Sequence, residues 1–177
     1  MIHLVFERPS GVLKAYHFTG QLRYLWQAFG GAVAASNGPM PEGHFILLEP
    51  ELFPQDTWDM ATGWGRVRIR DMSDDDIALL RNAGLLKSET DGRLQIGGIS
   101  LYPGHCNAYD RAIEIHGGGS ALGDPACYAP FQALCCTLGC TRVHNRNIAD
   151  LIGYMQQFSS DHTFVMSAMG SPGPCQC

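Results

Sequence analysis

A cysteine and an upstream histidine in the second half of the chain are candidates for nucleophilic catalysis. Cys140 directly follows Gly139, and His116 comes earlier, at the end of an apolar run. A thiol with a pKa of about 8.5 is mostly protonated at neutral pH, so a nucleophilic cysteine needs a base or a cation beside it. An imidazole titrates in the right range to be that base. The pair therefore indicates attack of sulfur on a carbonyl, that is, acyl transfer.

The residues around Cys140 fit the same chemistry. Gly139 lets the backbone approach a carbonyl closely, and the N–H groups of Gly139 and Cys140 are candidates to face a developing oxyanion. Arg142 has the forked guanidinium that binds a carboxylate in two places. We therefore predict acyl transfer on a substrate that carries a free carboxylate.

The order of these residues resembles the catalytic segment of the L,D-transpeptidases, the YkuD domain family. In that family an apolar strand ends in His-Gly, and Ser/Thr-x-Gly-Cys-x-Arg-x-x-Asn follows further along the chain. The matching residues here are Ile115-His116-Gly117 and then Thr137-Leu138-Gly139-Cys140-Thr141-Arg142-Val143-His144-Asn145. Papain-like and NlpC/P60-type cysteine peptidases have the opposite order, with the cysteine before the histidine. Residues 39–45 resemble the turn and strand that the family has upstream.

The resemblance implies a reaction on peptidoglycan stem peptides. Cys140 would attack the carbonyl of the diamino acid at the third position and release the terminal D-alanine, with His116 as the base. Transfer of the acyl group to an amine would give a 3–3 cross-link or a D-amino-acid exchange, whereas transfer to water would make the protein an L,D-carboxypeptidase. The resemblance implies no cofactor, and the site of action would be the periplasm or the cell wall.

The same resemblance nominates residues that bind substrate or shape the site. Arg142 and Asn145 would order the loop or hold a stem carboxylate, and Gly117 and Thr137 belong to the same motif. The insert at residues 118–136 is expected to form a lid that decides the acceptor.

The cysteine count leaves several readings open. The chain has seven cysteines, so one catalytic thiol and up to three disulfides would fit an oxidising destination. Burial of several as small apolar side chains is the alternative.

A structural zinc site is a competing hypothesis, built from Cys106, Cys127, Cys135 or Cys136 with His105 or His44. The spacing of paired zinc ligands is missing except in the too-close Cys175-Gln176-Cys177, so we predict no metal. A catalytically inactive wall-binding protein is a third possibility, which the presence of the Cys, His and Arg disfavours.

Composition predicts one compact, mainly β domain. The 177 residues are 45% hydrophobic and 16% charged, and 21 Gly and 10 Pro favour short strands joined by turns. We assign residues 1–170 to one YkuD-like catalytic domain and residues 171–177 to a flexible tail of Gly, Pro and Cys. The expected fold is a β-sandwich or barrel with two or three short helices.

Charge and hydropathy exclude two classes of partner. The net charge is −5 without a basic cluster, which argues against nucleic acid. No apolar run reaches the length of about 18 residues that a membrane span needs. The first residues also lack the pattern of a secretory signal peptide. An effector delivered into a competitor's periplasm, or a phage-borne enzyme, is therefore an alternative to a housekeeping cross-linker.

Local patterns predict the elements that must position the site. Runs of β-branched and aromatic residues predict strands at residues 2–6, 12–18, 22–29, 44–49, 94–101, 110–115 and 165–166, with another inside 58–71. Ser73, followed by three aspartates, predicts the start of a helix that Gly84 ends. A second helix is expected at residues 147–155, where apolar residues recur at helical spacing. The strand ending at His116 and the helix after Cys140 would hold the two candidate catalytic residues.

Overall fold

A closed barrel forms the centre of the molecule. The computed structural model describes residues 1–17, 19–30, 42–134, 137, 139–158 and 164–170. Within these ranges eight strands close the barrel in the order β1 (Ile2–Glu7), β11 (Phe164–Met169), β4 (Gly43–Leu52), β5 (Gly65–Asp71), β9 (Glu114–His116), β10 (Thr141–Val143), β3 (Leu22–Phe29) and β2 (Val12–Tyr16). Only the β1–β11 and β9–β10 pairs are parallel. The predicted mainly β class is confirmed.

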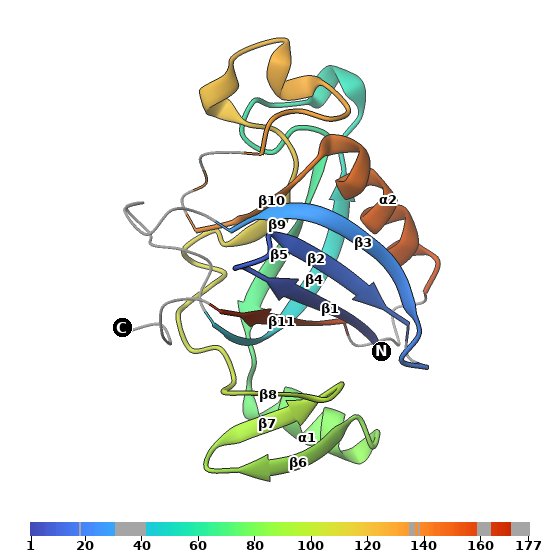
Figure 1. Ribbon diagram of the computed structural model, residues 1–177, viewed down its shortest axis with the longest axis vertical. Helices are drawn as coiled ribbons and strands as arrows, with labels where there is room; N and C mark the ends of the chain where they lie inside the picture. The colour runs from blue at the N-terminus through green and yellow to red at the C-terminus, as the bar shows by residue number, and fades with distance from the viewer. Residues whose placement is uncertain (18, 31–41, 135–136, 138, 159–163, 171–177) are drawn as a thin grey trace.

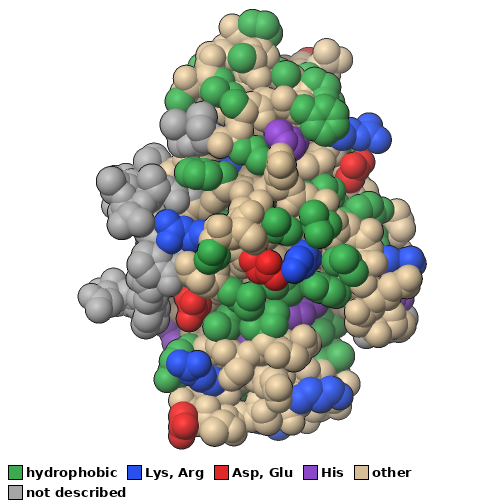
Figure 2. Space-filling view, in the orientation of Figure 1, with side chains coloured by type: hydrophobic (Ala, Val, Ile, Leu, Met, Phe, Trp, Pro, Cys, Tyr) green, Lys and Arg blue, Asp and Glu red, His purple; other side chains and the backbone are tan. Residues whose placement is uncertain are grey.

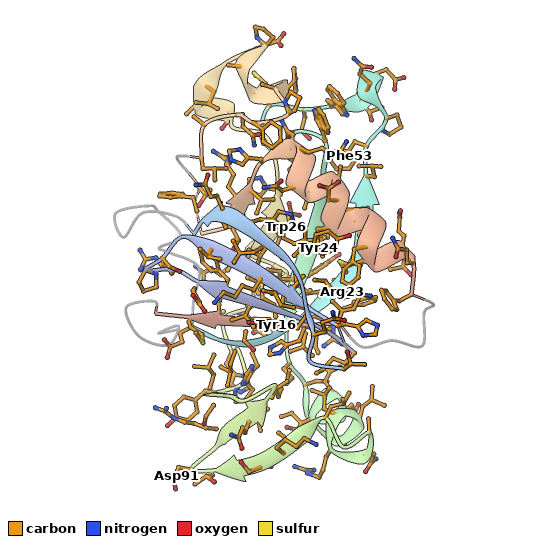
Figure 3. All side chains as sticks on the ribbon, turned by 45° about the vertical axis from the view of Figure 1, so that its right-hand side comes forward. Tyr16, Arg23, Tyr24, Trp26, Phe53 and Asp91 are labelled. Carbon is orange, nitrogen blue, oxygen red and sulfur yellow. The ribbon has the colours of Figure 1, made fainter. Side chains whose placement is uncertain are left out.

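Helix α2 (Asn145–Gln156) packs against the barrel and completes its core (Figure 1). Ile148, Leu151 and Ile152 are fully buried at helical spacing. Its Tyr154 ring meets Tyr24 of β3 edge-on, and Tyr24 stacks on Trp26 (Figure 3). Because α2 follows β10 directly, its burial fixes the segment that carries Cys140.

A small second sheet lies at one end of the barrel (Figure 1). It contains β6 (Leu86–Thr90), β7 (Arg93–Ile96) and β8 (Ile99–Leu101), and α1 (Asp74–Asn82) packs beside it. Leu80, Leu94 and Ile96 from this part form one cluster with Ile46 and Val165 of the barrel. The predicted cap of α1 is confirmed, because Ser73 and Asp76 form a reciprocal capping box.

Three short 3-10 helices lie at the end of the molecule opposite the small sheet (Figure 1). They are η1 (Gln55–Thr57), η2 (Ser120–Leu122) and η3 (Ala126–Tyr128). Trp58 stacks on Trp64 at a centroid distance of 4.9 Å, and the Trp64 indole donates to the Tyr128 carbonyl. These aromatic contacts join the loop before β5 to the segment after His116.

Several predicted bounds are wrong, each for a local reason. The strand predicted at 94–101 is two strands, because Gly97 and Gly98 both have positive φ and turn the chain between β7 and β8. The strand predicted at 110–115 begins only at Glu114, because the preceding residues form a turn that ends at Ala112, with φ of 50°. Helix α2 begins at Asn145, two residues early. Strands β6 and β10 were not predicted.

A hydrogen-bonded polar chain, the His3–Ser167–His44 chain, lies between the barrel wall and the small sheet. His44 Nε2 lies 2.9 Å from the Leu94 carbonyl oxygen, so this nitrogen carries the proton. His44 Nδ1 then accepts from the Ser167 hydroxyl at 2.8 Å, and Ser167 Oγ accepts from His3 Nε2 at 2.6 Å. All three side chains are buried, and this chain links β1, β11 and β4 to the small sheet. Its hydrogen bonds satisfy polar groups that would otherwise destabilise the core.

Charged side chains of both signs are scattered over the face shown in Figure 2. No helix among the described residues is long and apolar enough to cross a bilayer.

Candidate active site

Pairing of β9 with β10 brings His116 and Cys140 to one face of the barrel wall. Thr141 lies opposite Ile115, and Arg142 lies opposite His116. Continuing this register by one residue places Cys140 beside Glu114. Since alternate residues of a strand share a face, Cys140, Arg142, Glu114 and His116 share one, and the opposite face contributes Ile115 to the core. The Cα atoms of His116 and Cys140 are then about 8 Å apart, within reach of converging side chains.

The His116 ring is buried and held in one orientation. Its Nδ1 lies 2.7 Å from the Gly117 carbonyl oxygen, which can only accept, so Nδ1 carries the proton of the neutral ring. Nε2 therefore holds the lone pair, and among the described residues it has no hydrogen-bond partner. Burial, followed by the nearby Arg142 charge, lowers the pKa of His116 to about 4. At neutral pH the imidazole is thus uncharged and able to accept a proton.

Cys140 is partly accessible and protonated at rest. Its thiol donates to the Ala112 carbonyl oxygen at 3.3 Å. Burial is the largest influence and raises the pKa of Cys140, with the Glu114 carboxylate adding to the rise. The backbone N–H of Glu114 and the Arg142 charge act in the opposite direction. If the neutral His116 imidazole takes the proton of the neutral thiol as sulfur attacks, the reaction is general-base catalysis.

The glycines after His116 make room for close backbone packing. Gly117 N donates to the Thr62 carbonyl oxygen at 3.1 Å, and Gly119 N donates to the Met60 carbonyl oxygen at 2.7 Å. A Cβ atom on Gly117 would collide with Asn145 Oδ1, and Gly118 has φ of 62°. The His-Gly-Gly-Gly segment is therefore fixed against the loop before β5, which the sequence did not indicate as part of the site.

Asn145 is fully buried and binds this segment to its surroundings. Its Oδ1 accepts from the backbone N–H groups of Gly118 and Trp64, at 2.8 and 3.2 Å. Its Nδ2 donates to the carbonyl oxygens of Cys127 and Ala129. Of the two roles we considered for Asn145, these bonds favour ordering the loops over holding a substrate carboxylate.

Gln132 has a similar scaffolding place, and no sequence signal pointed to it. Its side-chain amide donates to the carbonyl oxygens of Gly118 and Val143, and its Oε1 accepts from the backbone N–H of Asn145. The Gln132 side chain is 3% exposed. It therefore connects the segment after His116 to the segment after Cys140.

The other predicted site residues flank Cys140. Thr137 Oγ1 donates to the Cys140 carbonyl oxygen at 2.9 Å, which supports the turn before β10. Gly139 has φ of 113°, a conformation that favours glycine. Arg142 is only 3% exposed, and an ideal Cβ on Gly119 would lie 3.5 Å from its Nη1. The guanidinium thus lies under the glycine segment, where its charge acts on His116 and Cys140.

Two arginines of β5 also belong to the face that carries Cys140, and sequence analysis did not nominate them. Arg66 lies opposite His116, and Arg68 lies opposite Glu114. Both form ion pairs with Glu114 and Glu51. Burial raises the pKa of Glu114, while Arg66 and Arg68 act to lower it. The alternation of Arg66 and Arg68 with apolar residues is typical of a strand with one solvated face, and only the pairing with β9 places that face beside Cys140.

The described cysteines other than Cys140 have no catalytic arrangement. Cys106 and Cys127 are buried, as expected for small apolar side chains. Cys135, Cys136, Cys175 and Cys177 lie outside the described residues. His44, proposed for the zinc alternative, is engaged by Ser167 and Leu94. In the described part of the chain no group of three His, Cys, Asp or Glu side chains is arranged to hold a metal.

Comparison with known proteins relates the fold to two solved structures. Models of known protein families give no match, and neither does a sequence search of curated proteins. Bd1075 of Bdellovibrio bacteriovorus superimposes with a TM-score of 0.50 at 13% identity, over 95% of this chain and 47% of that one. The helical cell shape determining protein Pgp2 of Campylobacter jejuni, as its K307A mutant, gives 0.52 at 12% identity, over 98% and 48%.

A third solved structure is more distant. L,D-transpeptidase 1 of Mycobacterium tuberculosis gives a TM-score of 0.43 at 14% identity, over 96% of this chain and 61% of that one. The chain spans about half the length of Bd1075 and Pgp2. At these identities the similarity shows that the chain shares the fold of Bd1075 and Pgp2.

Proposed function

We propose that the protein is a cysteine acyltransferase that acts on peptidoglycan stem peptides. The observation that carries the proposal is the pairing of β9 with β10, which sets Cys140 and His116 on one face in the order of the L,D-transpeptidase motif. The fold shared with Pgp2, a protein that determines helical cell shape, supports a substrate in the cell wall.

Acylation would begin with His116 Nε2 taking the thiol proton while Cys140 Sγ attacks the carbonyl of the third-position diamino acid. The N–H groups of Gly139 and Cys140 would stabilise the oxyanion. Collapse of the tetrahedral intermediate breaks the amide bond to D-alanine, and the imidazolium returns its proton to the leaving amine. The Nδ1–H bond to the Gly117 carbonyl oxygen fixes the tautomer in which Nε2 carries the lone pair, and this supports Nε2 as the atom that would accept the thiol proton.

Deacylation would transfer the acyl group from Cys140 to an amine, with His116 accepting the amine proton. The product is a 3–3 cross-link or a stem with an exchanged D-amino acid. Water as the acceptor would give L,D-carboxypeptidase activity instead. The site of action would be the periplasm or the cell wall, where this substrate is found.

Incubation with purified tetrapeptide muropeptides, followed by mass spectrometry, tests the proposal. A dimer that lacks one D-alanine identifies a transpeptidase, and a tripeptide alone identifies a carboxypeptidase. Cys140→Ser should abolish either product and His116→Gln should slow its formation, while Cys127→Ser is the matched control for loss of a thiol. Products that persist in Cys140→Ser, or no product from the wild-type protein, would refute the proposal.

A further inference from the structure

A groove opens on the outer face of the barrel wall, next to the backbone that the Cys140 thiol contacts. It has a volume of about 290 Å³, and its lining includes Arg66, Arg68, Tyr109, Ala112 and Glu114. Cys140 is not part of this lining, but its thiol donates a hydrogen bond to the carbonyl oxygen of Ala112, which is. The groove and the attacking sulfur are therefore neighbours through Ala112.

The groove is built on anchored backbone. Asp71 accepts from the backbone N–H groups of Cys106 and Asn107, both at 2.7 Å, and from that of Ala108 at 3.2 Å. Ala112 N in turn donates to the Tyr109 carbonyl oxygen at 3.0 Å. This turn holds Tyr109 and Ala112 opposite the arginines of β5, so the groove is preformed.

Arg142 and Arg68 differ in how far their side chains are exposed to solvent. Arg142, the carboxylate ligand expected from the motif, is 3% exposed beneath the glycine segment. The Arg68 side chain is 35% exposed and reaches Tyr109 Oη at 3.5 Å. Arg68 and Tyr109 thus offer donors to a ligand in the groove, while Arg142 is covered.

Charges of both signs face the groove in a defined order. Glu114 lies beside Cys140 by strand register, and Arg68 lies on the far side of Glu114. Strands are about 4.8 Å apart, so the Arg68 and Cys140 backbones are separated by about 10 Å. Arg68 forms ion pairs at 3.3 Å to Glu51 and at 3.8 Å to Glu114. A ligand with an amine near sulfur and a carboxylate beyond it matches this order.

We propose that this groove binds the terminal amino acid of the substrate, with Arg68 and Tyr109 holding its carboxylate and Glu114 facing its amine. The inference rests on the proposed function and names the recognition element of that same site. In a peptide the carboxylate of the last residue lies about 4 Å beyond the scissile carbonyl, on the side where Glu114 and then Arg68 follow Cys140 across the strands. Arg68 and Tyr109 are binding residues, while Cys140 and His116 perform the chemistry.

The same groove would serve both the release of the terminal amino acid and the entry of a D-amino acid acceptor. On acylation the amide bond breaks, a thioester forms on Cys140, and the thiol proton passes through His116 to the departing amine. The amine then takes a second proton from water and leaves as a zwitterion, its ammonium group facing Glu114. A free D-amino acid that enters the same groove would give up those two protons and attack the thioester. Glu114 thus favours an amine acceptor over water.

The first test compares substrates that differ only in the terminal carboxylate. The rate constant kcat/KM is measured for a tetrapeptide muropeptide and for its C-terminal amide, using the wild-type protein, Arg68→Gln and Arg68→Lys. Wild type should prefer the free acid, and Arg68→Gln should lower kcat/KM for that substrate about tenfold to a hundredfold, as expected for loss of a charged hydrogen bond. The amide should be turned over at a similar rate by both proteins. Arg68→Lys should restore part of the preference.

A matched control guards against a general effect on folding. Arg81→Gln removes another ion-paired arginine, exposed on α1 and bonded to Glu89, and should leave the preference unchanged. Equal losses on the acid and the amide in Arg68→Gln, or a wild-type protein that does not distinguish them, would overturn the assignment.

A binding measurement separates failure of the groove from failure of the proposed function. D-alanine is titrated into Cys140→Ser protein, with and without Arg68→Gln, by isothermal calorimetry. Binding that weakens at least about tenfold in the double variant supports the groove, even if no peptide is turned over. Absence of D-alanine binding, or binding that Arg68→Gln leaves unchanged, overturns the groove. A wild-type protein that forms no Cys140-dependent product refutes the proposed function alone.

Discussion

His116 and His44 are both buried on barrel strands, and burial lowers the pKa of each imidazole to about 4. They differ in their partners. Both nitrogens of His44 are engaged, by Ser167 and by the Leu94 carbonyl, whereas His116 uses only Nδ1 among the described residues. Burial and a lowered pKa therefore do not identify a base. The candidate site differs from the His3–Ser167–His44 chain in one feature. Its histidine has a ring nitrogen without a partner among the described residues, on the face that carries a cysteine.

Replacing each histidine with glutamine should give the largest contrast. His116→Gln should lower the rate of Cys140-dependent product formation about 10²- to 10⁴-fold, because the proton acceptor is lost. The protein should remain folded, since the change leaves the surrounding loops in place. His44→Gln should act in the opposite way, with an unfolding free energy about 1–3 kcal/mol lower and a rate per folded molecule near wild type. A rate lost equally in both variants would contradict the distinction.

Removing the scaffold of the candidate site should mainly affect stability. Asn145→Ala leaves two backbone N–H groups and two carbonyl groups without their buried partner. We expect the unfolding free energy, measured in urea, to fall by about 3–5 kcal/mol. Asn147→Ala, on the same helix and half-buried, should change it by less than about 0.5 kcal/mol. Similar values for the two variants would show that Asn145 is not the scaffold.

Removing the central hydroxyl of the His3–Ser167–His44 chain should lower the stability by a smaller amount. Ser167→Ala removes the hydroxyl between His3 and His44 and leaves two buried ring nitrogens unpaired. The unfolding free energy should fall by about 1–3 kcal/mol without a change in the rate of the candidate reaction. A lowered reaction rate with an unchanged unfolding free energy would mean that the His3–Ser167–His44 chain contributes to catalysis.

Lowering the pH should reduce the stability and the reaction rate over different pH ranges. Folded His3 and His44 have pKa values of about 4, below the ordinary 6.5, so the unfolded chain binds more protons between these values. Their contribution to stability is therefore complete above pH 6.5 and falls as pH drops toward 4. Thermal melts should show this fall, and a His3→Gln/His44→Gln variant should show less of it. The rate should instead persist to about pH 5 and fall near pH 4, where His116 protonates. A rate that already falls at pH 6.5 would contradict the buried state of His116.

Sequence patterns predicted what depends on near neighbours. Ser73 and Asp76 are close in the chain, so the capping box that starts α1 could be predicted, as could the buried stripe of α2. Gly97 and Gly98 were the missed local signal for the turn between β7 and β8. The apolar residues of 94–101 suggested one strand because periodicity alone does not show where a strand reverses.

Features that depend on pairing between distant strands were not predictable. Arg66 and Arg68 reach the candidate site only because β5 pairs with β9, and Gln132 joins two segments that meet only in the folded chain. Arg142 was predicted as a carboxylate ligand from its chemistry, but its burial depends on the glycine segment above it. The motif thus located the candidate catalytic pair, whereas the groove beside it required the fold.

Mass spectrometry of a covalent intermediate tests the central claim most directly. The wild-type protein is mixed with a tetrapeptide muropeptide, quenched in acid and digested. We predict a mass increase equal to the muropeptide without its terminal D-alanine, located on the peptide that contains Cys140 and absent in Cys140→Ser. His116→Gln should form this adduct much more slowly. An adduct on another cysteine, or none during turnover, would contradict a Cys140 acyl-enzyme.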